Sequence, residues 1–143
     1  MQAGGVLIRR ATESDIPRIF EIRNNVRENK LSDPSRVTVA DTRWFIVNPG
    51  IFVWEEDGRI IGFSAADPRN GSIWALFMDR AYEGRGIARA LFERACEVLR
   101  DAGFKRIWLT TDPGTRAEAF YRAAGWQVSG HRGRELLFEA VLQ

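Results

Sequence analysis

Residues 79–88 read Asp-Arg-Ala-Tyr-Glu-Gly-Arg-Gly-Ile-Ala, and they join a predicted strand, 72–79, to a predicted helix that ends near Gly103. Two glycines within three residues let the backbone turn tightly and approach a ligand closely. The first amide groups of a helix have no partner inside it and lie at its positive end, so such a junction favours a phosphate group. Arg85 and Arg89 would add positive charge. The stretch therefore predicts an anion-binding turn.

Two common nucleotide-binding motifs are excluded here. No Gly-x-x-x-x-Gly-Lys-Ser/Thr pattern occurs in the chain, which excludes a P-loop. The dinucleotide fingerprint fails because Arg89 stands at the place of its third glycine. The turn also follows the fourth predicted strand, whereas the fingerprint normally follows the first. A plain strand-to-helix turn without a ligand remains the alternative, and the rest of the chain must decide between the two.

Outward from this turn, the pattern predicts a mixed sheet with helices. Two capping pairs, Thr12 with Asp15 and Thr38 with Asp41, introduce helices before the turn. Asp57-Gly58 and Asn70-Gly71 are hairpin turns that separate three antiparallel strands. The predicted strands are 6–10, 51–54, 59–66, 72–79, 106–111, 126–129 and 135–142, and the predicted helices are 16 to about 29, 39 to before Pro49, 87–103 and 114–124.

The order of these elements indicates the fold class. A helix between the fourth and fifth strands makes that pair parallel, because a strand, helix and strand in sequence form a crossover. We therefore expect a single α/β (α+β mixed) domain over residues 1–143, with a central, mostly antiparallel sheet of about seven strands, one parallel pair and four flanking helices. In the first helix, Ile16 and Ile19 recur at core spacing, while Arg18 and Arg23 point in other directions and are predicted to face water.

Composition limits the function classes. The 21 basic and 19 acidic side chains leave a net charge of +2, which is a weak signal for nucleic acid, and the apolar stretches are too short to cross a membrane. Residues 1–5 do not resemble a secretory signal, so a cytoplasmic location is expected. The one cysteine, Cys96, and the one histidine, His131, give no disulfide and too few ligands for a metal site. Cys96 is predicted to be a core residue.

Two motifs resemble those of the GNAT superfamily of acyl-CoA-dependent N-acetyltransferases. The family's pyrophosphate loop has the pattern Gln/Arg-x-x-Gly-x-Gly/Ala, and residues 83–88 occupy it, with Glu83 in place of the usual glutamine or arginine. Residues 117–126 resemble the family's Ala-x-x-Phe/Leu-Tyr-x-x-x-Gly-Phe/Trp segment. The predicted element order also matches the GNAT fold from Val6 to Leu142. The resemblance thus covers nearly the whole chain.

The resemblance implies acetyl-CoA as co-substrate, with no metal, and a direct attack of an amine on the thioester through a tetrahedral intermediate. Tyr121 matches the tyrosine that, in the family, commonly donates a hydrogen bond to the leaving sulfur and can protonate it. It is the candidate catalytic residue. The matching cofactor-binding positions are Leu76, Phe77, Met78, Glu83, Gly84, Arg85, Gly86, Ile87, Ala88 and Arg89.

The acceptor side is less defined by the resemblance. Candidate acceptor-binding residues are Arg27, Glu28, Lys30 and Trp74, of which Arg27 or Lys30 would suit a carboxylate on the acceptor. The fourth predicted strand has no internal carboxylate before Asp79, so the base is open between Glu28, Asp67, Asp112 and a water relay.

Several functions stay open at this point. The leading interpretation is acetylation of a primary amine on a small metabolite; the alternatives are acetylation of a protein N-terminus or lysine, and an acyl-CoA-binding sensor without turnover. We expect acetyl-CoA and an amine acceptor as partners, no nucleic acid and no membrane, and a homodimer is left open.

Overall fold

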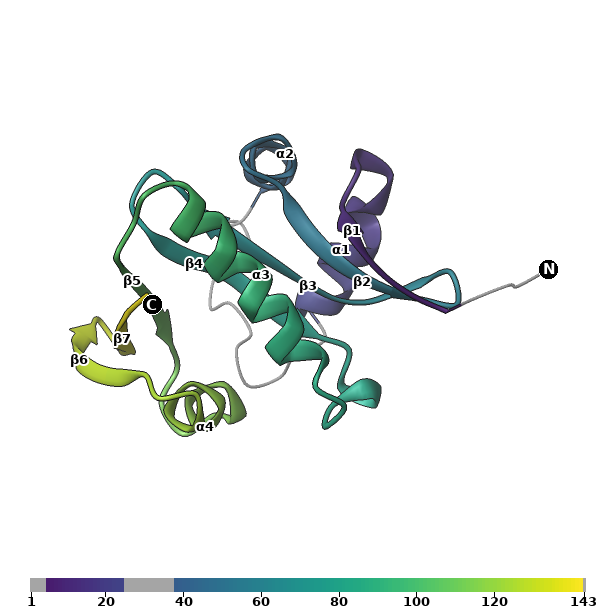
Figure 1. Cartoon of the computed structure of the whole chain (residues 1–143). Helices are drawn as coiled ribbons and strands as arrows, with labels where there is room; N and C mark the ends of the chain where they lie inside the picture. Colours follow the sequence, from purple (N-terminus) through teal and green to yellow (C-terminus); the bar gives the residue numbers. More distant parts are fainter. Residues whose placement is uncertain (1–4, 25–37, 143) are drawn as a thin grey trace.

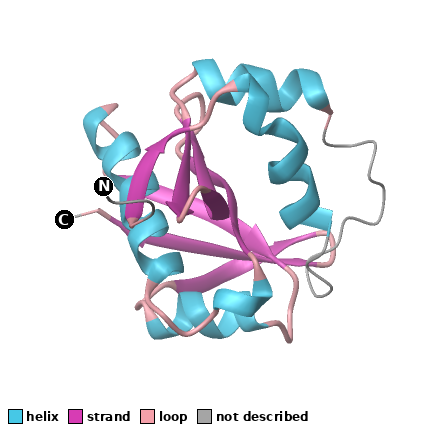
Figure 2. Ribbon diagram, turned by 90° about the vertical axis from the view of Figure 1, so that its right-hand side faces the viewer, coloured by secondary structure: helices cyan, strands magenta, loops and turns pink. Residues whose placement is uncertain are grey.

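The computed structural model describes residues 5–24 and 38–142. Seven strands form one sheet in the order β1-β2-β3-β4-β5-β7-β6, and helices lie on both sides of it (Figure 2). All neighbouring strands are antiparallel except β4 and β5, which are parallel. The strands are β1 (Val6–Arg10), β2 (Ile51–Glu56), β3 (Arg59–Asp67), β4 (Ser72–Met78), β5 (Arg106–Thr111), β6 (Gln127–Arg132) and β7 (Glu135–Val141). The helices are α1 (Ile16–Asn24), α2 (Val39–Val47), α3 (Ile87–Asp101) and α4 (Arg116–Ala123).

The predicted fold class is confirmed, and the described elements differ from prediction mainly at their ends. Residues 25–29 of the first predicted helix lie outside the described residues. Both capping pairs form: the amide of Thr12 donates to the carboxylate of Asp15, and the hydroxyl of Thr38 accepts from the amide of Asp41. The interval between the last two predicted strands, 126–129 and 135–142, predicted a turn at His131, and this is wrong, because His131 lies in β6, paired with Leu136 of β7. The hairpin turns instead at Gly133, whose φ of 60° suits a tight two-residue connection. No helix among residues 5–24 and 38–142 is long and apolar enough to span a membrane.

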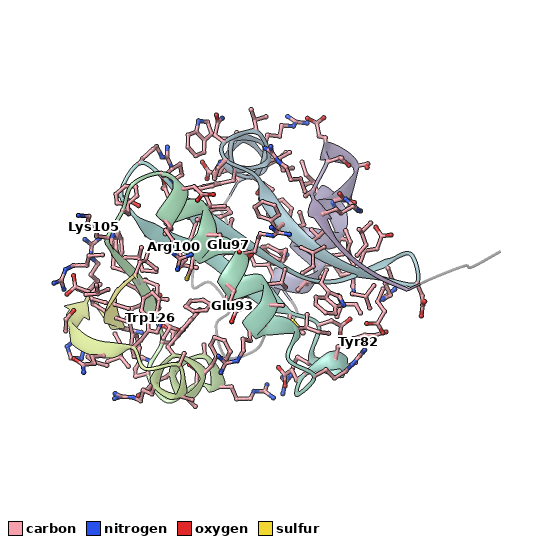
Figure 3. The ribbon with its side chains drawn as sticks, viewed as in Figure 1. Tyr82, Glu93, Glu97, Arg100, Lys105 and Trp126 are labelled. Carbon is pink, nitrogen blue, oxygen red and sulfur yellow. The ribbon has the colours of Figure 1, made fainter. Side chains whose placement is uncertain are left out.

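Two apolar clusters hold the helices to opposite faces of the sheet. Ile19 and Ile22 of α1 and Phe45 of α2 pack with the inner residues of β2, β3 and β4. On the other face, α3 crosses the sheet diagonally (Figure 1) and contributes four buried residues, Phe92, Ala95, Cys96 and Leu99, to a cluster shared with β5, α4 and β7. The outward side of α3 carries Glu93, Glu97 and Arg100 (Figure 3).

Cys96 is a core residue, as predicted. Its side chain packs in the α3 cluster, and burial raises the pKa of the thiol to about 11. Since only a thiolate is a good nucleophile, this cysteine is suited to packing rather than to reaction at neutral pH.

The parallel pair opens almost as soon as it forms. β4 and β5 are paired at Ser72 and Trp108, where the amide of Trp108 donates to the carbonyl of Gly71 over 3.1 Å. Beyond this point the two strands diverge (Figure 1). The β3–β4 register also shifts, because Ala65 pairs with Ala75 while Ala66 pairs with Ile73, so Trp74 is the extra residue of a β-bulge. The bulge and the divergence together open the sheet next to α4.

Asp15 joins the first strand to the first helix through a two-pronged ion pair. Arg9 donates to both carboxylate oxygens over 2.9 and 3.2 Å, and it lowers the pKa of Asp15, against the opposing effect of burial. Because the folded pKa is depressed, this stabilisation is present above the ordinary carboxyl pKa and is lost as pH falls through the folded value.

Asp15→Asn is therefore expected to lower the free energy of unfolding at pH 7 by about 2 kcal/mol, and by much less at pH 3. Urea unfolding at both pH values measures the difference. Glu13→Gln is the matched control, because Glu13 lies in the same turn with a side chain that is 68% exposed, and its pair with Arg43 should contribute little. Equal losses for Asp15→Asn at the two pH values would contradict this account.

Candidate active site

A cleft of about 350 Å³ lies where β4 and β5 separate. Its wall on one side is the end of β4, and the other walls are the start of α3 and the inner side of α4. The lining residues are Leu76, Phe77, Met78, Glu83, Gly84, Gly86, Ile87, Ala88, Arg89, Arg116, Ala117, Phe120 and Tyr121. The cleft thus brings the two sequence motifs together, although 33 residues separate Glu83 from Arg116.

The glycine-rich loop gives the cleft an open row of amide groups. Asp79 begins the loop by accepting a hydrogen bond from the amide of Ala81, which fixes the short 3-10 turn Arg80–Tyr82. Gly86 is the N-cap of α3, and its φ of 80° lies in the left-handed region that favours glycine. A Cβ at Gly86 would meet nothing within 4 Å, so backbone conformation and not crowding calls for glycine here. The first amides of α3 have no intrahelical acceptors, and their residues, Ile87, Ala88 and Arg89, line the cleft.

An ion pair crosses the mouth of the cleft. Arg116, the first residue of α4, donates to the carboxylate of Glu83 over 2.7 Å. The pair neutralises the negative charge that Glu83 would otherwise add beside the helix start. Sequence reasoning missed Arg116, although its place one residue before the second motif was an available signal. Arg85 differs from the other loop positions, because its side chain pairs with Glu56 of β2 at 3.0 Å and does not line the cleft.

Tyr121 lines the cleft from α4 and is 6% exposed. Its ring packs among aromatic neighbours, with Phe92, Phe120, Trp126 and Phe138 at centroid distances of 5.3 to 6.0 Å. Burial raises the pKa of Tyr121 well above that of an ordinary phenol, and the nearby Cys96 adds to the effect. The hydroxyl therefore keeps its proton at neutral pH and is available as a donor.

The arrangement has the parts of an acyl-transfer site: an anion-binding helix start, an open strand edge and a buried, protonated phenol. Residues 16–126 match the profile of the family described as the Acetyltransferase (GNAT) family. The chain belongs to the GNAT acetyltransferases. The match includes both motifs and every element from α1 to α4.

Individual relatives agree with this assignment. An uncharacterized N-acetyltransferase of Mycobacterium tuberculosis is 31% identical over 86 residues, which are 57% of this chain and 55% of that protein. The mycothiol acetyltransferase of Beutenbergia cavernae is 39% identical over 99 residues, or 64% of this chain and 32% of that protein. The chain thus spans about half the length, or less, of these two relatives.

A solved structure shows the same fold. The PaiA N-acetyltransferase of Thermoplasma acidophilum, in complex with coenzyme A, superimposes with a TM-score of 0.79 at 16% identity, covering 96% of this chain and 99% of that one.

Of the residues expected to bind the acceptor in this GNAT chain, the structure describes only Trp74. Trp74 does not line the cleft; it lies on the α1/α2 face, stacked on Phe45 at 4.0 Å. Arg27, Glu28 and Lys30 lie outside the described residues. Asp67, a further carboxylate near the end of β3, is bonded to the side chain and the amide of Arg69. No base is therefore assigned.

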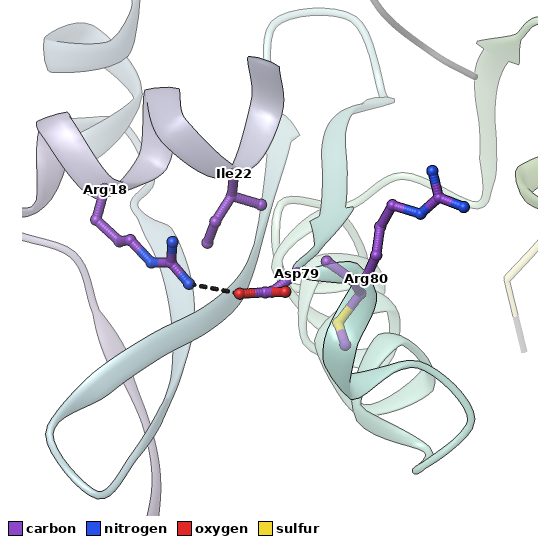
Figure 4. Close-up of a pocket in the computed structure, with 5 residues that line it drawn as sticks. Arg18, Ile22, Asp79 and Arg80 are labelled. Atoms are coloured by element: carbon purple, nitrogen blue, oxygen red, sulfur yellow. Dashed lines mark hydrogen bonds and ion pairs between the residues drawn. The ribbon is translucent and has the colours of Figure 1, made fainter. Parts of the chain in front are cut away.

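A smaller pocket, of about 110 Å³, lies between α1 and the end of β4. Arg18 reaches across it from α1 and donates to Asp79 over 2.8 Å, while the side chain of Arg80 turns away (Figure 4). The ion pair ties the start of the glycine-rich loop to α1. Among the described residues, no group of three or more histidine, cysteine or acidic side chains is placed to hold a metal ion.

Proposed function

We propose that this protein is an N-acetyltransferase that moves the acetyl group of acetyl-CoA to a primary amine, and that the amine belongs to a small metabolite. The observation that supports this most directly is the shared cleft, which the first residues of α3 and Tyr121 both line. The name of the relative mycothiol acetyltransferase favours a small-molecule acceptor over a protein.

The residues present fit coenzyme A. The first amides of α3 suit its diphosphate, and the open space in front of Gly84 and Gly86 leaves room for it. Arg89 adds positive charge on one side of this space, while the Arg116–Glu83 pair on the other side carries no net charge. Leu76, Phe77 and Met78 offer the unpaired edge of β4 to the amide groups of the pantetheine arm. We infer that these groups, together with residues 83–88, hold the co-substrate.

In the proposed reaction, the neutral amine attacks the thioester carbonyl, the new C–N bond forms, and the C–S bond breaks from the tetrahedral intermediate. The amine loses a proton and the sulfur gains one, so the proton count balances. Tyr121 donates a hydrogen bond to the departing sulfur. Full proton transfer from a phenol, with an ordinary pKa of about 10, to a thiolate, whose acid has a pKa of about 8.5, is uphill by roughly 2 kcal/mol. Stabilisation of the thiolate by the hydrogen bond is therefore the main role assigned to Tyr121.

The test is thiol release from acetyl-CoA with a panel of amines that includes small metabolites, a lysine peptide and a peptide with a free N-terminus. Release that depends on both substrates supports the proposal, and the best acceptor decides between metabolite and protein. Tight binding of acetyl-CoA in calorimetry without release for any acceptor would favour the sensor.

Glu83→Gln is expected to raise the affinity for acetyl-CoA roughly 2- to 5-fold, because it removes a negative charge near the diphosphate and releases Arg116 from their ion pair. Calorimetry at low ionic strength measures the change, which should shrink in added salt. Glu93→Gln, on the outer side of α3, is the control and should leave the affinity unchanged. A weaker affinity for Glu83→Gln would instead mean that the ion pair organises the loop for binding.

A further inference from the structure

Arg23 has an environment that the sequence did not predict. It was expected to face water, but its guanidinium lies against the sheet, 4.6 Å from the ring centre of Phe77 and 5.6 Å from that of Trp74. Nε and Nη1 are both buried, and neither has a hydrogen-bond partner among the residues that the structure describes. Buried polar atoms are nearly always paired in folded proteins, so two unpaired nitrogens on one charged group need an explanation.

The charge itself makes this arrangement costly. Burial lowers the pKa of Arg23, but an arginine stays protonated at neutral pH, so a positive charge remains in a poorly solvated place. The two aromatic rings offer a weak attraction to the cation and no hydrogen-bond acceptor in their planes. A buried charge of this kind is favourable only when an anion joins it.

Arg18, in the same helix as Arg23, has the hydrogen-bond partners expected of an arginine with a structural role. Its Nε donates to the carbonyl of Ile60, and its two terminal nitrogens donate to Glu21 and Asp79. Every nitrogen of Arg18 is thus paired, although the side chain is 17% exposed. Arg23, five residues later, has no such partners for its buried nitrogens within residues 5–24 and 38–142. The contrast indicates that the partner of Arg23 is supplied from outside the described structure.

Phe77 connects Arg23 to the active site. This residue lines the cofactor cleft, and the guanidinium of Arg23 lies over its ring. Trp74, the bulged residue of β4, supports the other side of the same cation. A small molecule held at Arg23 would therefore lie beside the wall of the cleft where the acetyl transfer is proposed.

We propose that Arg23 binds a carboxylate of the acceptor, so that the acceptors are amines that also carry a carboxylate, such as amino acids. This inference rests on the proposed acetyltransferase function. The planar guanidinium presents two parallel N–H donors along an edge, which match the two oxygens of a carboxylate. A carboxylate on either edge would pair one of the two buried nitrogens together with Nη2 and would neutralise the charge, whereas an uncharged amide in the same place would leave the charge unneutralised.

The first test compares amino acids with their carboxamides as acceptors in the thiol-release assay. The wild type should favour the carboxylates, and Arg23→Gln should reduce kcat/KM for them roughly 10- to 100-fold, mainly through KM, while carboxamides change little. Arg23→Lys should recover part of the loss, because it keeps the charge without the paired donors. Arg94→Gln is the matched control, since Arg94 of α3 also lies over an aromatic ring, that of Phe52 of β2, but lines neither pocket.

The outcomes separate the two proposals. Turnover of amines with no preference for a carboxylate would overturn the role of Arg23 and leave the acetyltransferase intact. No turnover of any amine, despite a folded protein, would overturn the acetyltransferase. In a second readout, the NMR signal of the Arg23 Nε–H should shift when an amino acid is added and should stay in place when its carboxamide is added. A signal that does not respond to any carboxylate acceptor would contradict the binding site.

Thermal stability tests the alternative that Arg23 serves only to pack the fold. Arg23→Met should leave Tm unchanged or raise it, because it removes an unpaired buried charge, whereas Arg18→Met should lower Tm by roughly 4 °C or more. If Arg23→Met loses as much stability as Arg18→Met and the preference for carboxylates survives in the folded variant, Arg23 serves packing and the proposal fails.

Discussion

Tyr121→Phe is expected to lower kcat for acetyl transfer by roughly 100-fold or more, while the Kd for acetyl-CoA changes less than about twofold. The substitution keeps the ring, which packs against Phe92 and Phe138, and removes only the hydroxyl. The hydrogen bond to the leaving sulfur matters most in the transition state, so kcat should carry the loss.

The pH profile sharpens this prediction. Because burial raises the pKa of Tyr121, the wild-type rate should not decline through loss of the phenolic proton between pH 7 and about pH 10, where an ordinary tyrosine is already half ionised. Tyr82→Phe is the matched control, since Tyr82 is the other tyrosine of the chain and is not among the residues that line the cleft. It lies in the loop before α3 (Figure 3). Unchanged turnover of Tyr121→Phe at saturating substrates would remove Tyr121 from the mechanism.

Gly86→Glu is expected to weaken acetyl-CoA binding roughly 100-fold. Two effects add: a side chain at a φ of 80° strains the helix start by about 1–2 kcal/mol, and the new carboxylate stands in the space assigned to the diphosphate. Calorimetric titration with acetyl-CoA measures the loss.

Two further variants separate strain from charge. Gly86→Ala carries only the strain and should lose far less affinity than Gly86→Glu. Gly103→Glu repeats both changes at an exposed glycine with a φ of 95° beyond the far end of α3, and it should bind acetyl-CoA like the wild type. If Gly86→Glu binds acetyl-CoA as tightly as Gly103→Glu, the glycine-rich loop is not the diphosphate site.

Local signals accounted for most of the fold. Strand and helix patterns depend on residues close together in the chain. The turns Asp57-Gly58 and Asn70-Gly71 and the apolar stripe of α3 are patterns of this kind, so their elements could be predicted to within a few residues. The bulge at Trp74 and the early separation of β4 from β5 depend on how distant strands meet. No local pattern encodes them.

The candidate site divides in the same way. The loop residues and Tyr121 could be selected because each lies in a motif of fixed spacing. Arg116 and Arg23 could not, because their importance comes from neighbours far away in the chain: Glu83 for the first, and the rings of Trp74 and Phe77 for the second. Helical periodicity even placed Arg23 on the wrong side, because a long arginine side chain can bend back over an apolar surface.

The pairing of β4 with β5 at one residue pair, Ser72 and Trp108, has a consequence for thermal stability. Past Ser72, the backbone of β4 has lost a neighbour on one side, and a ligand rich in peptide-like groups can serve as a substitute strand there. Bound acetyl-CoA would then stabilise the contact between the β4 side and the β5 side of the sheet, and its removal would weaken that contact. Melting curves should move upward with ligand concentration, and amide exchange should slow most in β4 and at the start of α4.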